Sequence, residues 1–403
     1  MTDPIWDNVV PLRARDDTDP QSTEQPNHLW ISDGDWDEAD IPKRKWVSRG
    51  YFLRGSVTVI SGPGSSGKSM LTVAWATALA MDCALGRFRT EGQNRVLIYN
   101  TEDDQDEQRR RFSAILGHMR LTPADLGNRV AMLGPQNVGT LLERNRDGQF
   151  VRTETFRHLL AYVKTFKPDV LVLDPLVELH NAEENDNTAL RAVLAELRSL
   201  AVQHEMAVLV LHHSRKPLST PTPGDPDTLR GASAIVGAAR VVFTVNVMSE
   251  EEAAAFNIPP SDRRDYFRVD SAKSNYSRAS DAEWFHRHAR TLRNGEEVPF
   301  AWPWNPPNPL KQATPQDLNA VLDAIVAGPS PGFLYAKSKR GRGGGDRWAG
   351  NVVMAKLDCS EPQAKDIIGK WLETGLLFEA TFQHPKDGEK AGVKVNPNKR
   401  PSL

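Results

Sequence analysis

A lysine and a hydroxyl group follow a glycine-rich segment in an order suited to holding phosphates. Residues 62–69 read GPGSSGKS, after an apolar run at 57–60 and before a second apolar stretch. Glycines let backbone N–H groups turn toward a phosphate, and a helix that begins there adds its positive end. Lys68 would reach the β- and γ-phosphates, and the Ser69 hydroxyl would bind Mg²⁺. The pattern predicts an ATP and Mg²⁺ site formed by Gly62, Pro63, Gly64, Ser65, Ser66, Gly67, Lys68, Ser69 and Met70.

Acidic residues at the ends of two expected strands fit the chemistry of hydrolysis. Asp174 ends an apolar run, where a carboxylate would hold the water shell of Mg²⁺. Pro175 follows it, so the base that orients the attacking water must come from elsewhere. Glu102 ends another apolar run and is the candidate base. Asp103 and Asp104 compete for this role, and a solvated acidic turn is a further interpretation.

Strands and helices alternate through the middle of the chain. Apolar runs indicate strands at 95–100, 169–174, 207–211, 241–245 and 266–269, and helix patterns cover 69–82, 106–119, 150–166 and 188–204. This alternation predicts an α/β fold with a mostly parallel sheet covered on both faces and ligands at the carboxyl ends of its strands. His212 and His213 follow one strand; we expect His213 to face the site and His212 the core.

These residues together resemble the RecA-like P-loop ATPase core, and more closely the plasmid RepA-type hexameric replicative helicases and related phage ATPases. The resemblance covers about residues 41–290. It is carried by the phosphate loop, Glu102, Asp174 and His213 in this order, and by the segments LHHSRK at 211–216, RGASAI at 230–235, AR at 239–240 and SAKSNY at 271–276. It implies a RecA-like fold, ATP hydrolysis and assembly into a ring.

The resemblance also implies roles for two residues beyond the phosphate loop. His213 would sense the γ-phosphate, and Arg240 would be the arginine finger that enters the ATP site of the neighbouring subunit. Arg230 is an alternative finger, and Lys273 is a candidate second cation acting in trans. Related ring helicases carry an arginine two residues after such a lysine, but this chain has Asn275. That departure favours Arg240.

Two loops after strands would face the centre of such a ring. The loop at 214–232 holds Arg215, Lys216 and Arg230 and suits a DNA phosphate backbone, although a plain surface loop is the alternative. The loop at 175–188 contains Glu183, Glu184 and Asp186, which makes it a poor DNA surface.

The C-terminal part has the pattern of a winged helix. A proline-rich linker is expected at 299–311, followed over 312–403 by three helices and a hairpin. From residue 311 onward, fourteen Lys and Arg stand against ten Asp and Glu, which favours DNA binding, although winged helices also dock proteins. The candidate DNA contacts are Gln363, Lys365 and Lys370 on the third helix, and Lys337, Lys339, Arg340, Arg342 and Arg347 in a glycine-rich loop.

Composition narrows the class of protein. Residues 1–40 hold eleven Asp and Glu against two Lys and Arg, which predicts a disordered acidic tail, folded back over the core or docking a basic partner. No apolar run approaches the ~18 residues of a membrane span, and the N-terminus lacks a secretion-signal pattern, so we expect a cytoplasmic protein. Cys83 and Cys359 imply neither a disulfide framework nor a zinc site.

The hypothesis with the most support is an ATP-driven DNA motor. Its expected form is a hexameric replicative helicase of plasmid or phage type, with an ATPase domain at 41–298. One alternative is a DNA-binding recombination or loading ATPase that does not unwind. Another is a regulatory nucleotide switch with a DNA-docking domain.

Overall fold

The computed structural model describes residues 37–146, 148–181, 186–213, 224, 232–275, 282–339, 345–385 and 388–402. The chain divides into two compact units, residues 1–44 and 45–403. In the first unit, the described residues include a 3-10 turn at Glu38–Asp40, capped by the Asp37 carboxylate, which accepts the N–H of Ala39. The rest of the predicted acidic tail lies outside the described residues.

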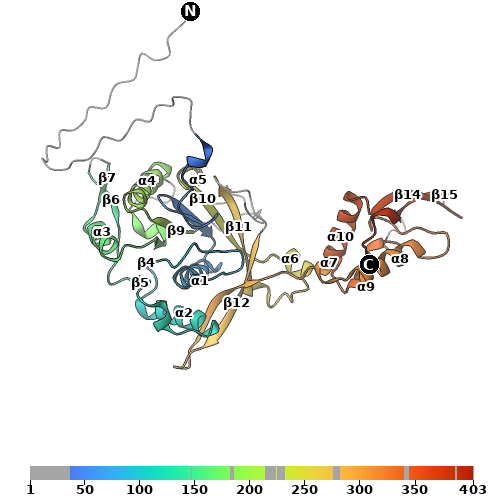
Figure 1. The fold of residues 1–403 in the computed structure, drawn as a ribbon, viewed down its shortest axis with the longest axis horizontal. Coiled ribbons are helices and arrows are strands. Elements are labelled where there is room, and N and C mark those ends of the chain that lie inside the picture. The colour runs from blue at the N-terminus through green and yellow to red at the C-terminus, as the bar shows by residue number, and fades with distance from the viewer. Residues whose placement is uncertain are drawn as a thin grey trace, which may run out of the picture. The chain divides into compact units, whose positions relative to one another are not determined.

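A nine-stranded sheet forms the centre of the second unit (Figure 1). Its order is β13-β12-β11-β10-β3-β9-β8-β4-β5. The parallel part comprises β10 (Val241–Val247), β3 (Val57–Gly62), β9 (Ala207–His213), β8 (Val170–Asp174), β4 (Val96–Asn100) and β5 (Val130–Leu133). The antiparallel strands at the other side are β11 (Tyr266–Ser274), β12 (Glu283–Thr291) and β13 (Glu297–Trp304). The carboxyl ends of β3, β4, β8 and β9 therefore meet at one edge.

Helices cover both faces of the parallel strands, and strands buried on both faces are mainly apolar, as β3, β4, β8 and β9 are here. Val96 and Ile98 face a core shared with α1 (Lys68–Met81) and α2 (Gln105–His118). Leu97 and Tyr99 face the opposite core, which includes α3 (Glu154–Phe166), α4 (Asn187–Gln203) and α5 (Ala232–Ala238). The predicted α/β class with a mostly parallel, covered sheet is confirmed.

One predicted helix begins later than its sequence pattern suggested. Residues 150–152 form β7 (Phe150–Arg152), which pairs with β6 (Leu142–Arg144). Helix α3 starts only at Glu154, because the Thr153 hydroxyl accepts the N–H of Phe156 and caps it. Further short elements of this unit include β1 (Trp46–Ser48), β2 (Phe52–Leu53) and α6 (Glu250–Ala255).

The prediction of a linker over residues 299–311 is wrong in its first part. Residues 297–304 form β13, which pairs with β12 without a break from Trp304, opposite Trp284, to Glu297, opposite Thr291. Prolines are tolerated in an edge strand because its outer side has no partner. The sheet therefore extends to residue 304 and not only to 298.

The C-terminal part has its own apolar core. Its elements are α7 (Pro309–Gln312), α8 (Pro315–Ala327), α9 (Ala349–Leu357), α10 (Glu361–Glu373), β14 (Leu377–His384) and β15 (Gly388–Val395). The buried residues of this core include Val321, Val353, Ile367 and Trp371. The three predicted helices are present as α8, α9 and α10. The predicted hairpin is present as well, because β14 and β15 pair antiparallel.

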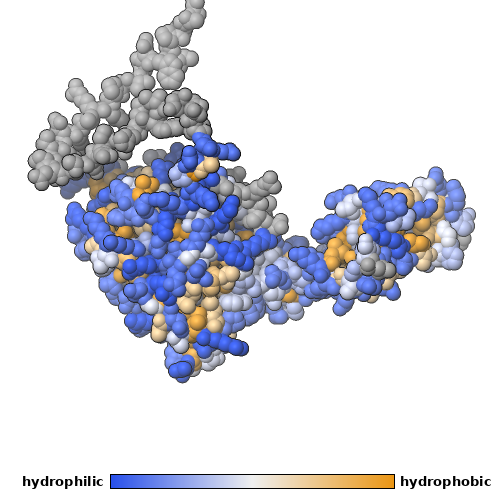
Figure 2. Space-filling model, in the orientation of Figure 1, coloured by the Kyte–Doolittle hydropathy of each residue, from blue (hydrophilic) through white to orange (hydrophobic). Residues whose placement is uncertain are grey.

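The surface of the described residues is mainly polar. Hydrophilic residues cover most of the face seen in Figure 2. The large apolar side chains that are exposed come from separate elements: Ile41, Tyr162, Val202, Val326 and Phe378. In the part of the chain that the structure describes, we find no helix with the length and apolar character to cross a membrane.

A buried glutamate on β12 joins the antiparallel strands to residues 51 and 87, near the beginning of the second unit. Glu283 on β12 accepts the Tyr51 hydroxyl at 2.9 Å and the Arg87 N–H at 2.6 Å. Burial raises the pKa of Glu283 above its ordinary value of 4.5. The charged form of this carboxyl is therefore less stable in the fold than in the unfolded chain.

We expect Glu283→Gln to be more stable than the wild type at pH 8, because it has no buried charge to desolvate. The amide keeps an acceptor for Arg87 and offers a donor to Tyr51, but removes the buried charge. Because the folded pKa is raised, the wild type loses stability as the pH rises through the range above 4.5, so the difference should vanish near pH 4. Urea unfolding at both pH values measures it, and a variant that is less stable at both would contradict this account.

Candidate functional site

The glycine-rich segment joins β3 to α1, so the first N–H groups of that helix point into the loop. Lys68 and Ser69 are the first residues of α1. Ser65 and Gly67 have φ angles of 60° and 105°, and this alternation of backbone conformation turns N–H groups inward around an anion. A Cβ on Gly67 would lie 3.0 Å from ring carbons of Phe267. The outer strand β11 therefore packs against the loop and requires glycine there.

Lys68 is a buried cation at the inner side of the loop. Its Nζ donates to the carbonyls of Gly62 and Pro63 at 2.9 Å each and lies 3.4 Å from Nδ1 of His213. Burial lowers the pKa of Lys68 to about 8, although Asp174 and Glu102 attract its charge. A bound triphosphate would supply the negative partner that favours the charged form.

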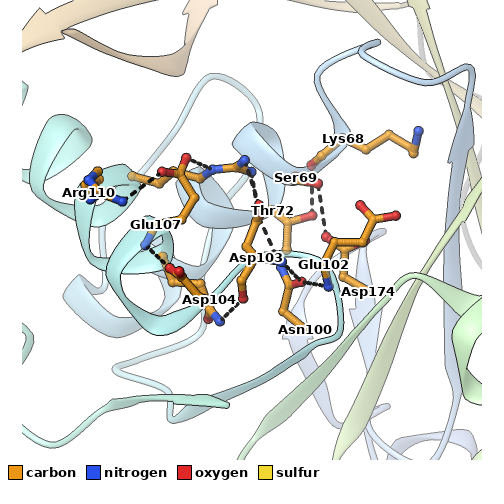
Figure 3. Close-up of polar contacts among 12 residues, drawn as sticks. Lys68, Ser69, Thr72, Asn100, Glu102, Asp103, Asp104, Glu107, Arg110 and Asp174 are labelled. Carbon is orange, nitrogen blue, oxygen red and sulfur yellow. Dashed lines mark hydrogen bonds and ion pairs between the residues drawn. The ribbon is translucent and has the colours of Figure 1, made fainter. Parts of the chain in front are cut away.

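Ser69 and Asp174 fit a magnesium ion. The Ser69 hydroxyl donates to Oδ2 of Asp174 at 3.0 Å, where the end of β8 meets the start of α1 (Figure 3). Burial raises the pKa of Asp174 to about 7, and the Ser69 hydrogen bond opposes this shift. A hydroxyl and a carboxylate at hydrogen-bond distance are the oxygen ligands that Mg²⁺ prefers, and a cation would relieve the cost of the buried carboxylate.

The three neighbouring acids after β4 have different surroundings (Figure 3). The Asp104 carboxylate accepts the N–H of Glu107 at 2.7 Å and caps α2. Asp103 pairs with Arg111 at 2.9 Å. The Glu102 side chain is 54% exposed, and its Oε1 lies 3.7 Å from Nε2 of His213. The interpretation as a solvated acidic turn is wrong for Asp103, which is paired with Arg111 and only 18% exposed, whereas Glu102 and Asp104 are exposed, as that interpretation expects. Glu102 is the carboxylate that faces the loop lysine and histidine.

His213 lies between the two charged groups of opposite sign. Its Nδ1 is 3.4 Å from Lys68 Nζ, and its Nε2 is 3.7 Å from the Glu102 carboxylate. Burial lowers the pKa of His213, and the Lys68 charge lowers it further. The imidazole is therefore neutral at neutral pH and has one donor and one acceptor nitrogen. His212 is buried, as expected.

Arg240 lies at the opposite end of the sheet from these residues. Its N–H donates to the Val57 carbonyl at 3.0 Å, which is the beginning of β3, whereas the phosphate loop follows the end of β3. The strand between them spans about 17 Å at ~3.3 Å per residue. This distance exceeds the reach of an arginine side chain, so Arg240 does not join the phosphate site of its own subunit.

Lys273 is engaged within its own subunit. Its Nζ donates to the Ala239 carbonyl at 2.9 Å and also to the Val236 carbonyl, at the last turn of α5. The N–H of Asn275 donates to the Arg240 carbonyl at 3.2 Å. β11 thus holds the backbone on both sides of Arg240. Arg230, the alternative finger, lies outside the described residues.

Of the seven basic residues predicted to contact DNA in the C-terminal part, five are described, and three of these have acidic partners. Gln363 was expected to point outward, which is wrong, because its Oε1 accepts the Ser360 N–H at 2.9 Å in the capping box of α10. Lys365 is exposed, and the Arg347 guanidinium lies over the Phe382 ring. Arg340 and Arg342 lie outside the described residues. Ion pairs join Lys337 to Glu379, Lys339 to Glu361 and Lys370 to Asp366.

Three further residues near the site were missed from the sequence. Asn100 accepts the N–H groups of Glu102 and Asp103 at 2.8 Å each, and an asparagine whose side chain bonds the backbone two residues further on is a known turn signal. Arg111 binds Asp103, and Arg287 on β12 donates to the Ser65 carbonyl of the loop at 2.9 Å. Arg287 is 222 residues from Ser65 along the chain, so no local pattern points to it.

Comparisons with known proteins agree with this geometry. A family model described as an AAA domain matches residues 20–218. Together with the strand order and the phosphate loop, this match supports a RecA-like P-loop ATPase. The phosphate loop and the α/β fold therefore agree on this class of protein.

Two solved structures are similar at a low level. A KaiC-like protein from the hyperthermophilic archaeon Pyrococcus horikoshii OT3 is 17% identical, with a TM-score of 0.38 over 63% of this chain and 93% of that chain. The RadB recombinase is 16% identical, with a TM-score of 0.37 over 60% of this chain and 90% of that chain. Similarities this low carry no conclusion about function.

We expect Gly67→Ala to destabilise the fold by ~1–3 kcal/mol and to weaken binding of a fluorescent ATP analogue. Alanine would be strained at φ 105° and would press on Phe267. Gly64→Ala is the matched control, because a Cβ there meets nothing within 4 Å and should leave unfolding unchanged. Equal stability of the two variants would refute the packing of Phe267 against the loop.

Proposed function

We propose that this protein is an ATP-driven DNA motor, and specifically a hexameric DNA helicase of the replicative type found in plasmids and phages. The motif set that resembles RepA-type helicases supports the proposal. One geometric observation carries it: the phosphate site and the exposed Arg240 lie at opposite ends of the same parallel strands. Such a subunit would complete its site only with an arginine from a neighbour, as in a head-to-tail ring.

Each residue of the site has a distinct part in this mechanism. Lys68 would neutralise charge on the transferring phosphoryl group, and Ser69 and Asp174 would hold Mg²⁺. Bound Mg²⁺ would offset charge on the β- and γ-phosphate oxygens. The Glu102 carboxylate would accept a hydrogen bond from the attacking water and orient it. Arg240 of the adjacent subunit would stabilise charge that develops in the transition state.

His213 is suited to report which nucleotide is bound. It contacts both Lys68 and Glu102, so a γ-phosphate between these groups would change the hydrogen bonds of the imidazole. The loop that follows β9 carries Arg215, Lys216 and Arg230, which lie outside the described residues. We infer that this loop contacts the DNA backbone by charge.

The two other functions share the ATPase core but differ in what they do to DNA. A recombination or loading ATPase would hydrolyse ATP faster with single-stranded DNA and leave duplexes intact. A regulatory switch would bind DNA through its C-terminal part, with turnover that does not respond to DNA. Lys337, Lys339 and Lys370 have acidic partners, but exposed ion pairs of this kind are weak and do not prevent contact with phosphates.

We expect the protein to separate a forked duplex in a strand-displacement assay with Mg²⁺ and ATP. Lys68→Ala, which lacks the loop cation, should bind DNA but displace no strand. DNA-stimulated hydrolysis without displacement would replace the helicase proposal with the accessory ATPase. Turnover that is insensitive to DNA would favour the switch.

Two inactive variants should restore activity when they are mixed. Arg240→Ala keeps an intact phosphate site, and Lys68→Ala keeps an intact Arg240, so about a quarter of the junctions in 1:1 mixed rings would be complete. ATP hydrolysis of the mixture should then exceed that of either variant alone. The double variant Lys68→Ala/Arg240→Ala is the control and should not rescue Arg240→Ala. Mixed oligomers verified by native mass spectrometry that stay inactive would defeat the trans role.

A further inference from the structure

The direction of Glu102 depends on the backbone turn that carries it. β4 ends at Asn100 and α2 begins at Gln105, so the chain reverses within residues 101–104. More than half of the Glu102 side chain is exposed, and its carboxylate lies 3.7 Å from the His213 ring. Packing therefore contributes little to its orientation, and the groups that fix the turn decide where the carboxylate points.

Asn100 holds the turn from the strand side. Its side chain is buried, and its Oδ1 accepts the N–H groups of both Glu102 and Asp103 at 2.8 Å. Its Nδ2 donates to Oδ2 of Asp103 at 3.3 Å. The Thr101 N–H donates to the Asp174 carbonyl at 2.9 Å, which ties the turn to the strand of the magnesium site.

Arg111 holds the same turn from the helix side. Its two terminal nitrogens bind the two oxygens of the Asp103 carboxylate, at 2.9 and 3.0 Å, which is bidentate pairing. Its Nε also binds Glu107 at 2.9 Å, so the guanidinium is itself fixed. Gln108 donates to the Asp103 carbonyl at 3.0 Å. Arg111 and Asp103 are only 22% and 18% exposed, unlike an ordinary surface pair.

The pairing also controls where the second acid of the turn lies. Asp103 lines a small cavity together with Ser69 and Asp174, beside the magnesium ligands. Its charge contributes to the raised pKa of Asp174. A carboxylate released from Arg111 would be free to turn toward that cavity, and the turn would lose its anchor on α2.

We propose that Asn100, Asp103 and Arg111 form a clamp that aims Glu102 at the γ-phosphate and keeps the Asp103 carboxylate paired with Arg111. In this clamp Arg111 is a positioning residue, since it acts through Asp103 and the turn and touches no substrate. The inference rests on the proposed role of Glu102. It adds a part of the site that lies on α2, outside the phosphate loop and the strand ends.

The test is the rate of ATP hydrolysis by the full chain with Arg111→Met. A misplaced catalytic group costs roughly 10²-fold, so we expect a kcat loss of this order, with the affinity for a fluorescent ATP analogue changed less than about threefold. Arg111→Lys, which keeps one of the two contacts, should lose less. Arg109→Met is the matched control, because the neighbouring Arg109 pairs with Asp106 on the exposed side of α2 and shares no partner with Arg111 in that pair.

A double-mutant cycle separates positioning from general damage. In the Glu102→Gln background, Arg111→Met should cause no further loss of single-turnover rate, because the residue through which it acts is already removed. An equal further loss in that background, a wild-type rate for Arg111→Met, or a parallel loss of nucleotide binding would each overturn the clamp. Full activity of Glu102→Gln itself would instead overturn the assignment of the base in the proposed function, so the two failures are distinguishable.

Discussion

Burial of opposite charges is the constraint on which this structure depends. Lys68 and Asp174 are each only 5% exposed, and burial shifts their pKa values in opposite directions, to about 8 and about 7. Both shifts mean that the charged forms are costly in the fold alone. A magnesium triphosphate carries both missing counter-charges, so the same burial that costs stability favours binding of that ligand.

The order and direction of the strands place the phosphate-site residues at one end of the parallel strands and Arg240 at the other. β9 lies between β3 and β8, which brings His213 between the loop lysine and the acid on the neighbouring turn. The parallel strands all deliver their last residues to this edge, so a single site collects groups that are more than a hundred residues apart in sequence. Arg240 lies at the opposite end of the strands, where β10 begins, and hydrogen bonds to β3 and to the residue after β11 fix its backbone there.

Sequence patterns located the phosphate loop, Asp174, Glu102 and His213 because each lies at, or within two residues beyond, the carboxyl end of a mainly buried strand. Parallel strands must bring such residues together, so their convergence follows from the topology. The patterns failed for residues 150–152 and 297–304, where helical spacing and prolines concealed strands that only long-range pairing stabilises. Arg111 and Arg287 could not be found either, because their contacts depend on the angle at which α2 and β12 pass the turn and the loop.

The prolines of β13 limit how subunits can associate. Pro299 and Pro303 are four residues apart, so both lack an N–H on the same side of the strand, and the unbroken pairing with β12 assigns that side to the open edge. A strand from another molecule would meet two missing donors there. The sheet is thus closed to edge-to-edge extension at β13, which is one of its two edge strands.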